Sequence, residues 1–496
     1  MKQFAYRLAA FFRSKRFFYV VIGFFILEAL WFALSAMYPM AFDEDFHFGI
    51  ITIYAEQWSP FLATQPAGGD VYGALVSDPS YLFHYLMSFP YRLVALFTDS
   101  QSVQVIVLRL LNVLLFAYSL VLFRRVLLRA KISQALTHVS LALFVLIPIV
   151  PMLAAHINYD NLFMVLLAWM CLLAFDVIDG LRSRQLAVKP LSILLVVWIS
   201  MALVKYAALP IVLGAAIFLA YMGIRSFWGH GGSFIPALKH GVLALSRGTG
   251  CVLLGALLIG SVLFVQRYGV NMYRYHTPVP ECDAVLSVGE CKAYGPWRRN
   301  HVLHDKRGDI NESPLFYTTH WLWGMWHRMF FAVNGPLGDN ATRFQLPIPA
   351  DTFIALAVLS LVALIAFWRR VFRGRAYLGF FLCVIVVYCG LLFFEEYSQY
   401  VYTGQPVAIN GRYLIPLLLL MAALAGRAFS VALGKRTALK ALAASIVLLL
   451  FLHGGGVMTF ILRSDKTWYW DNAVVLNVNE TAQDILRPII IEGSRW

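Results

Sequence analysis

The chain alternates between long apolar stretches and short polar segments, and this alternation predicts its architecture. Most of the apolar stretches are about 20 residues long, the length of an α-helix that crosses the roughly 30 Å hydrocarbon core of a bilayer. They are continuous, whereas the strands of a membrane barrel alternate apolar and polar residues. We therefore predict an all-α, polytopic transmembrane helix bundle of about eleven spans. The predicted spans are 17–37, 104–123, 137–154, 159–178, 190–204, 206–224, 248–266, 351–368, 377–394, 411–427 and 438–462.

The Lys and Arg residues between these spans predict the orientation of the bundle. With the N-terminus on the cytoplasmic side, every short internal segment is basic, and the short external loops 155–158 and 395–410 contain no Lys or Arg. The C-terminus is then external, together with loops 38–103 and 267–350 and the short tail 464–496. We treat residues 1–463 as one transmembrane catalytic domain. The net charge of +14 follows from this pattern and does not indicate nucleic-acid binding.

Composition and cysteine placement agree with a membrane protein. Hydrophobic residues make up 60% of the chain and charged residues 13%, a balance that a soluble protein of this length could not accommodate at its surface. Cys282 and Cys291 fall in the predicted external loop, where a disulfide would close a short ring in an oxidising compartment. The other cysteines fall in predicted spans, where we expect them to pack as small hydrophobic residues.

A cluster of acidic residues and one histidine follows the first predicted span, in the sequence Phe42-Asp43-Glu44-Asp45-Phe46-His47-Phe48-Gly49. We expect Asp43 to cap a short helix, with Glu44 and His47 on one face of its first turn. The cluster is then either a solvated loop with a helix cap or a functional site. Its position favours a function, because an acidic group at membrane height can meet a substrate whose lipid anchor stays in the bilayer.

Asp43-Glu44-x-x-His47 resembles the acidic motif of the GT-C glycosyltransferases, which include protein O-mannosyltransferases and the aminoarabinose transferases of lipid A. The Phe-Asp-Glu and His-Phe-Gly pieces are especially similar to the mannosyltransferase motif, with one extra residue between them. This extra residue leaves the register open between Asp43 and Glu44 as the catalytic position. We favour Asp43.

Further segments resemble other landmarks of this family in the expected order. Gly411-Arg412-Tyr413 is similar to a segment of uncharacterised bacterial multi-spanning members, while Asp78-Pro79 replaces the family's common His-Pro-Pro. The resemblance implies a GT-C type fold. The segments that carry it are 78–85, 109–112, 158–161, 204–210 and 411–416.

The resemblance implies transfer of a sugar from a polyprenyl phosphate to a hydroxyl of a glycolipid, polysaccharide or protein, on the external side of the membrane. A carboxylate takes the proton of the acceptor, and the phosphate leaves as an anion, so it needs cations rather than a general acid. Attack opposite the leaving group inverts the anomeric centre. The reaction requires no cofactor, although some relatives use a divalent cation and that option stays open.

We assign the catalytic roles to Asp43, as the base, and to Glu44, which orients the base or the acceptor. Other polar residues near the external ends of the spans are candidates for substrate binding. The cationic ones would hold the lipid phosphate, although such side chains also extend to lipid headgroups. The histidines would orient the substrate or ligate a metal. These candidates are His47, His84, Arg109, Asp160, Lys205 and Arg412.

The predicted external segments also contain aromatic and acidic residues and three Asn-x-Ser/Thr patterns. The aromatic series from Trp321 to Phe330 predicts a helix at the membrane interface. Glu395 and Glu396 could contact a sugar or simply be solvated, and we favour the solvated state. Asn-x-Ser/Thr patterns occur at three external positions, so the endoplasmic reticulum stays open beside the bacterial inner membrane, the location we predict. The asparagines of these patterns are Asn311, Asn340 and Asn479.

Two other functions compete with the enzyme. A transporter or flippase of a lipid-linked sugar would share the lipid substrate and the charged groups, and a non-catalytic scaffold of a cell-envelope complex would need neither. Transporters often contain internal repeats and helices that break at mid-membrane. The chain contains no such repeat, and its acidic cluster lies outside the predicted bilayer rather than midway across it.

Overall fold

The structure is a computed structural model that describes residues 2–40, 43–227, 234–307, 313–333, 343–345, 347–452, 460–462, 464 and 466–488. The first half contains α1 (Lys2–Arg13), α2 (Lys15–Ser35), α3 (Glu44–Ala55), α4 (Leu82–Ala95), α5 (Gln101–Arg129), α6 (Gln134–Val145), α7 (Ile149–Ala155), α8 (Tyr159–Arg182), α9 (Val188–Val204) and α10 (Leu209–Phe227). The second half contains α11 (Phe234–Leu243), α12 (Arg247–Phe264), the π-helical turn η3 (Val265–Gly269), α13 (Val270–Tyr275), α14 (Cys282–Val285), α15 (Val288–Cys291), α16 (Gly295–Asp305), α17 (Pro314–His327), α18 (Pro347–Phe372), α19 (Ala376–Thr403), α20 (Ile415–Ala432), α21 (Thr437–Leu452) and α23 (Ala473–Leu486). Two short strands, β1 (Phe331–Val333) and β2 (Arg343–Gln345), pair in an antiparallel manner.

Eight of the helices in the described part of the chain are long and apolar enough to cross a membrane. α6 and α7 form a ninth candidate that bends by 74°, and α9 and α21 are shorter apolar helices. Within the described residues, each predicted span overlaps a helix or a helix pair, whereas residues 453–459 of the predicted span 438–462 lie outside them. The protein is an all-α, multi-pass membrane protein. The eight candidates are α2, α5, α8, α10 with the preceding turn η2 (Tyr206–Ala208), α12 with η3 and α13, α18, α19, and α20 with the preceding turn η4 (Gly411–Leu414).

The candidate spans differ in how deeply they are buried within the protein. α8 is the most buried and packs along α5, with Phe163, Leu167 and Phe175 inaccessible to solvent. By contrast, the apolar window of α12 has no buried residue, and side chains such as Val252 and Ile259 are exposed along it. A helix that is apolar all round and lies at the edge of the protein needs a lipid environment.

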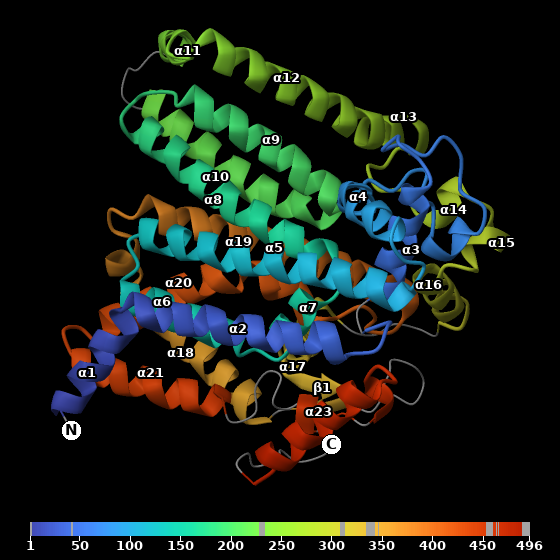
Figure 1. The fold of residues 1–496 in the computed structure, drawn as a ribbon. Helices are drawn as coiled ribbons and strands as arrows, with labels where there is room; N and C mark the ends of the chain where they lie inside the picture. The colour runs from blue at the N-terminus through green and yellow to red at the C-terminus, as the bar shows by residue number, and fades with distance from the viewer. Residues whose placement is uncertain are drawn as a thin grey trace.

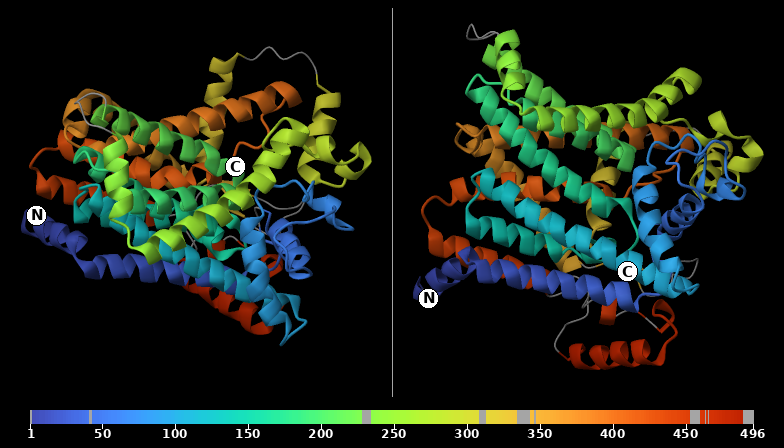
Figure 2. Two further views of the ribbon diagram at one scale, coloured as in Figure 1. Left: turned by 90° about the horizontal axis from the view of Figure 1, so that it is seen from above. Right: turned by 45° about the horizontal axis from the view of Figure 1, so that its top comes forward.

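The long helices run between two ends of the molecule (Figures 1 and 2). The N-terminus lies at one end, and α3, α4, α14, α15 and α16 gather at the opposite end (Figure 1). This second end therefore collects the segments between α2 and α5 and between α13 and α17, which the sequence predicts to be external loops.

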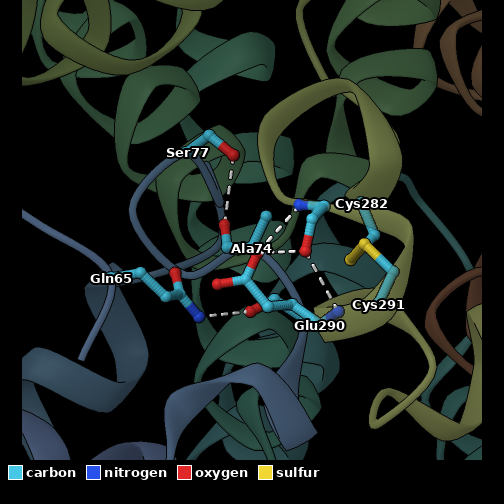
Figure 3. Close-up of a disulfide and its surroundings, with 8 residues drawn as sticks. Gln65, Ala74, Ser77, Cys282, Glu290 and Cys291 are labelled. Atoms are coloured by element: carbon cyan, nitrogen blue, oxygen red, sulfur yellow. Dashed lines mark hydrogen bonds between the residues drawn. A yellow bond between two sulfur atoms is a disulfide. The ribbon is translucent and has the colours of Figure 1, made fainter. Parts of the chain in front are cut away.

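The predicted disulfide is confirmed and lies within this gathering of short helices. Cys282 and Cys291 are bonded, and their ring lies beside residues 65–77 of the first external loop (Figure 3). Gly73 adopts a positive φ of 80°, and a Cβ there would lie 3.2 Å from the ring of Tyr294. The two predicted external loops thus pack against each other and form one cap over the bundle.

The tail after residue 464 is also folded onto the bundle. Asn479 of α23 is fully buried, because its side chain accepts a hydrogen bond from Trp31 Nε1 at 3.0 Å and donates one to Ser35 Oγ at 3.2 Å. This burial makes Asn479 unsuited to glycosylation in the folded protein, contrary to its Asn-x-Thr pattern. The other two asparagines of such patterns, Asn311 and Asn340, lie outside the described residues.

Candidate functional site

The side chain of Asp43 is held by a cation from a distant part of the chain. Asp43 precedes α3 with a left-handed φ of 71° and makes no capping hydrogen bond, so our expectation of an N-cap, which needs an extended backbone, is wrong. Instead, Arg412 Nη2 donates to Asp43 Oδ2 at 2.8 Å. The Asp43 side chain is 57% exposed and that of Arg412 is 14% exposed. The pair therefore combines an accessible carboxylate with a largely buried cation.

Arg412 is positioned by the turn η4 that starts α20. Its backbone N–H donates to Asn410 Oδ1 at 3.0 Å, which fixes the first residues of the turn. Gly411 lies so close to α17 that an added Cβ would overlap the carbonyl oxygen of Met325. A glycine is therefore required beside Arg412 for the turn to pack against α17.

The helix α17, which contains part of the predicted aromatic series, is in turn anchored on α19. Trp321 Nε1 donates to Glu396 Oε2 at 2.5 Å, and the hydroxyl of Tyr317 donates to the backbone carbonyl of Glu396 at 3.1 Å. Glu396 is buried, because α19 continues as a helix to Thr403, and our expectation of a solvated residue is wrong. Trp323 on the same helix is 59% exposed, as an interfacial aromatic residue should be.

A second pair, Lys205 and Asp160, lies next to the first. Lys205 Nζ is 2.5 Å from Asp160 Oδ1, and both side chains are nearly buried. Lys205 follows the last residue of α9, and Asp160 is in the first turn of α8, where Asn158 Oδ1 accepts a hydrogen bond from its backbone N–H at 2.8 Å. The negative Asp160 thus lies at a favourable helix N-terminus and compensates a cation that burial would otherwise disfavour.

Tyrosine rings connect the two ion pairs. The ring centroid of Tyr413 lies 5.7 Å from Lys205 Nζ and 5.3 Å from Arg412 Cζ, and Lys205 Nζ is 4.7 Å from the ring centroid of Tyr159. At these distances the aromatic faces attract the cations. Two positive side chains therefore lie against the same tyrosine ring and share one aromatic wall.

Glu44 and Arg109 form a third pair with different surroundings. Arg109 Nε and Nη2 donate to the two carboxylate oxygens of Glu44 at 2.8 Å and 2.7 Å, and both side chains are fully buried. Glu44 also accepts hydrogen bonds from the backbone N–H groups of Met40 and Ile157. Burial opposes ionisation of Glu44, but the charge and hydrogen bonds of Arg109 outweigh it and hold its pKa below the ordinary value.

The remaining donors of Arg109 bind the end of α2. Its guanidinium makes five hydrogen bonds in total, the number of its N–H groups, and three of them go to the carbonyls of Ala33, Ala36 and Met37. Arg109 therefore uses its donors within the protein and ties α2 to α5, rather than presenting them to a phosphate as we expected from the sequence.

His47 and His84 contact each other beside these pairs. His47 Nδ1 and His84 Nε2 are 2.8 Å apart, and the other ring nitrogen of His84, Nδ1, lies 3.2 Å from the carbonyl oxygen of Ser80. Burial lowers the pKa of His84 to about 3 and, with the neighbouring positive charges, that of His47 well below its ordinary value. Both rings are therefore neutral at physiological pH. No three His, Cys, Asp or Glu side chains among the described residues are placed to hold a metal ion.

The structure thus gathers most of the candidates at one end of the bundle, with Glu44 and Arg109 as a buried pair at the end of α2. Ser80, Tyr159 and Tyr413 had no role predicted from the sequence, although all three lie within segments that resemble family landmarks. Ser80 is a central contact, because its Oγ accepts a hydrogen bond from the backbone N–H of Tyr206 at 3.0 Å. It thereby joins the Lys205–Tyr206 turn to the histidine pair.

Comparison with known proteins adds no relative from which a function could be transferred. The chain matches no family model and no curated protein. The function must therefore be argued from the chemistry of the site.

Proposed function

We propose that this protein is an inverting glycosyltransferase that moves a sugar from a polyprenyl phosphate to an acceptor hydroxyl at the external end of the helix bundle. One observation carries the proposal: the accessible carboxylate of Asp43 lies 2.8 Å from Arg412, beside a second cation, Lys205, on a shared aromatic wall. A base and two cations at the end of membrane-crossing helices suit a hydroxyl that attacks the sugar and a lipid phosphate that leaves it.

The proposed reaction needs a base for the acceptor hydroxyl and positive charge for the leaving phosphate. A hydroxyl is a poor nucleophile, and a carboxylate within hydrogen-bond reach removes its proton as the new bond forms. Asp43 performs this step. The leaving phosphate carries its own negative charge, which the positive charges of Arg412 and Lys205 stabilise. Direct attack on the sugar inverts the anomeric centre.

Arg412 serves both sides of this reaction. Its Nη2 donates to Asp43 Oδ2, and the positive charge of the same side chain attracts phosphate oxygens. Glu44, which is buried and fully bonded, positions Asp43 by fixing the start of α3 and does not itself contact the acceptor.

The proposed topology has eleven crossings, with the N-terminus inside and the site outside. The basic segments 124–131 and 369–375 lie at the C-terminal ends of α5 and α18, away from the site, as the positive-inside rule requires. The disulfide between Cys282 and Cys291 supports an external position of the cap, since disulfides persist in oxidising compartments. We propose the bacterial inner membrane as the location and a GT-C type architecture, in line with the motif at Asp43.

The test is a transfer assay with the purified protein in lipid nanodiscs. The protein is incubated with a panel of radiolabelled sugars on a polyprenyl phosphate, together with membrane glycolipid, glycan or protein acceptors, with and without EDTA. The proposal predicts label in an acceptor for at least one donor. Movement of a labelled donor across liposomes without transfer would identify a flippase instead, and neither activity would favour the scaffold.

A further inference from the structure

The hydrogen bonds around the two buried histidines determine which ring nitrogens carry protons. The carbonyl oxygen of Ser80 can only accept, so the nitrogen that contacts it, His84 Nδ1, carries a proton. A neutral imidazole has one N–H group, and His84 Nε2 therefore presents a lone pair. This lone pair accepts a hydrogen bond from His47 Nδ1 at 2.8 Å. The same rule leaves a lone pair on His47 Nε2.

This assignment requires that both rings stay neutral, and their surroundings ensure it. Both side chains are buried, and the rings stack with an interplanar angle of 19°. Desolvation, the second ring, and the positive charges of Arg412 and Lys205 all lower the pKa of His47. His47 is therefore an acceptor of hydrogen bonds rather than a store for protons.

The position of His47 indicates which part of a substrate it would meet. The edge of its ring packs at 4.6 Å, centroid to centroid, against Tyr159, the same ring that lies under Lys205. Because Lys205 is one of the two cations proposed to hold the donor phosphate, His47 lies on the donor side of the site. A sugar hydroxyl is the hydrogen-bond donor that a neutral imidazole nitrogen would recognise there.

We propose that His84 is a positioning residue that holds His47 in the Nδ1–H tautomer, so that His47 Nε2 accepts a hydrogen bond from a hydroxyl of the donor sugar. The tautomer relay from Ser80 through His84 to His47 stands on the hydrogen-bond geometry and on the burial of both rings, and it does not depend on the proposed function. The contact with a sugar hydroxyl rests on the proposed function. The two parts therefore need separate measurements.

The relay is tested by solid-state NMR of the bilayer-embedded protein with labelled histidine nitrogens, where the signals of His47 and His84 are assigned by difference with single substitutions. Both residues should show a protonated Nδ1 and an unprotonated Nε2. His84→Gln retains an acceptor near the Nε2 position and should leave His47 unchanged, whereas His84→Leu should release its tautomer. A charged His47, or one protonated at Nε2, would overturn the relay, as would an unchanged tautomer in His84→Leu.

The contact with the sugar is tested by kinetics with donor analogues that each lack one hydroxyl. For the natural donor, His47→Phe should raise KM by about 3- to 10-fold, the loss expected for one neutral hydrogen bond, and His84→Gln should stay within about 2-fold. One deoxy analogue should be insensitive to His47→Phe, because its partner group is already missing. An equal effect of His47→Phe on every analogue would refute the contact. If the wild-type protein transfers no sugar at all, the proposed function fails, while the NMR result still decides the relay.

Discussion

Asp43 and Glu44 are neighbours in the chain, yet their carboxylates are placed in opposite environments. Each is bound by an arginine at 2.7–2.8 Å. Glu44 and Arg109 are fully buried and satisfied by hydrogen bonds within the protein, whereas the side chain of Asp43 is 57% exposed. The contrast separates a pair that holds helices together from a pair whose carboxylate is accessible.

The comparison also explains why one acidic motif can serve two purposes. Asp43 has a left-handed backbone and its side chain contacts Arg412, while Glu44 starts α3 and is buried in the protein. Rigid support next to an exposed reactive group is what positions a base accurately. Breaking the Glu44–Arg109 pair should therefore have different consequences from breaking the Asp43–Arg412 pair, and the two effects can be measured separately.

The largest effect on stability is expected from breaking the buried pair. Glu44→Gln leaves the Arg109 charge uncompensated, and we expect a loss of about 3–5 kcal/mol in unfolding free energy. Thermal or denaturant unfolding in detergent measures this loss. The double variant Glu44→Met with Arg109→Met is the matched control and should be less destabilised, since no charge remains buried. A stable Glu44→Gln protein that has lost activity would instead assign the catalytic position to Glu44.

A smaller loss is expected from Gly411→Ala, which acts on the support of Arg412. The new methyl group would overlap the Met325 carbonyl, so the turn η4 or α17 must move, at a cost of about 1–3 kcal/mol. Transfer activity should fall as well, because Arg412 moves with the turn. Gly390→Ala is the control, since nothing lies within 4 Å of a Cβ added there. Full activity of Gly411→Ala would show that the position of Arg412 is not critical.

The histidine pair predicts a pH dependence of stability. The pKa of His84 is about 3 in the folded protein against an ordinary value of 6.5. Between pH 3 and pH 6.5, the unfolded chain therefore binds a proton at His84 more readily than the folded protein does. The unfolding free energy should therefore fall as the pH is lowered from about 6.5 toward 3. Unfolding curves measured across this range should show a shallower decline in His84→Gln. An identical decline in both proteins would contradict the neutral, buried state of His84.

The smallest effect on stability is expected at Asp43 itself. An ion pair with a partly exposed carboxylate contributes between about 0 and 1 kcal/mol, so Asp43→Asn should unfold almost like the wild-type protein. Parallel unfolding curves of Asp43→Asn and Glu44→Gln give the direct contrast. Equal destabilisation of the two variants would mean that Asp43 is a structural residue.

The sequence predicted what depends on local pattern and failed where distant segments meet. Apolar runs predicted the helices, and the spacing and placement of Cys282 and Cys291 indicated their disulfide. The partner of Asp43 is 369 positions away, and no local pattern indicates such a pairing. The expected cap at Asp43 failed because its backbone turns left-handed, and the burial of Glu396 was missed because α19 extends past the predicted span.

The most direct test of the account is the kcat/KM of sugar transfer for Asp43→Asn beside Asp45→Asn, its exposed neighbour on α3. A general base contributes about 10²–10⁴-fold to the rate. The account predicts a loss of this size for Asp43→Asn, with the fold intact, and little change for Asp45→Asn. Wild-type transfer by the Asp43→Asn protein would contradict it.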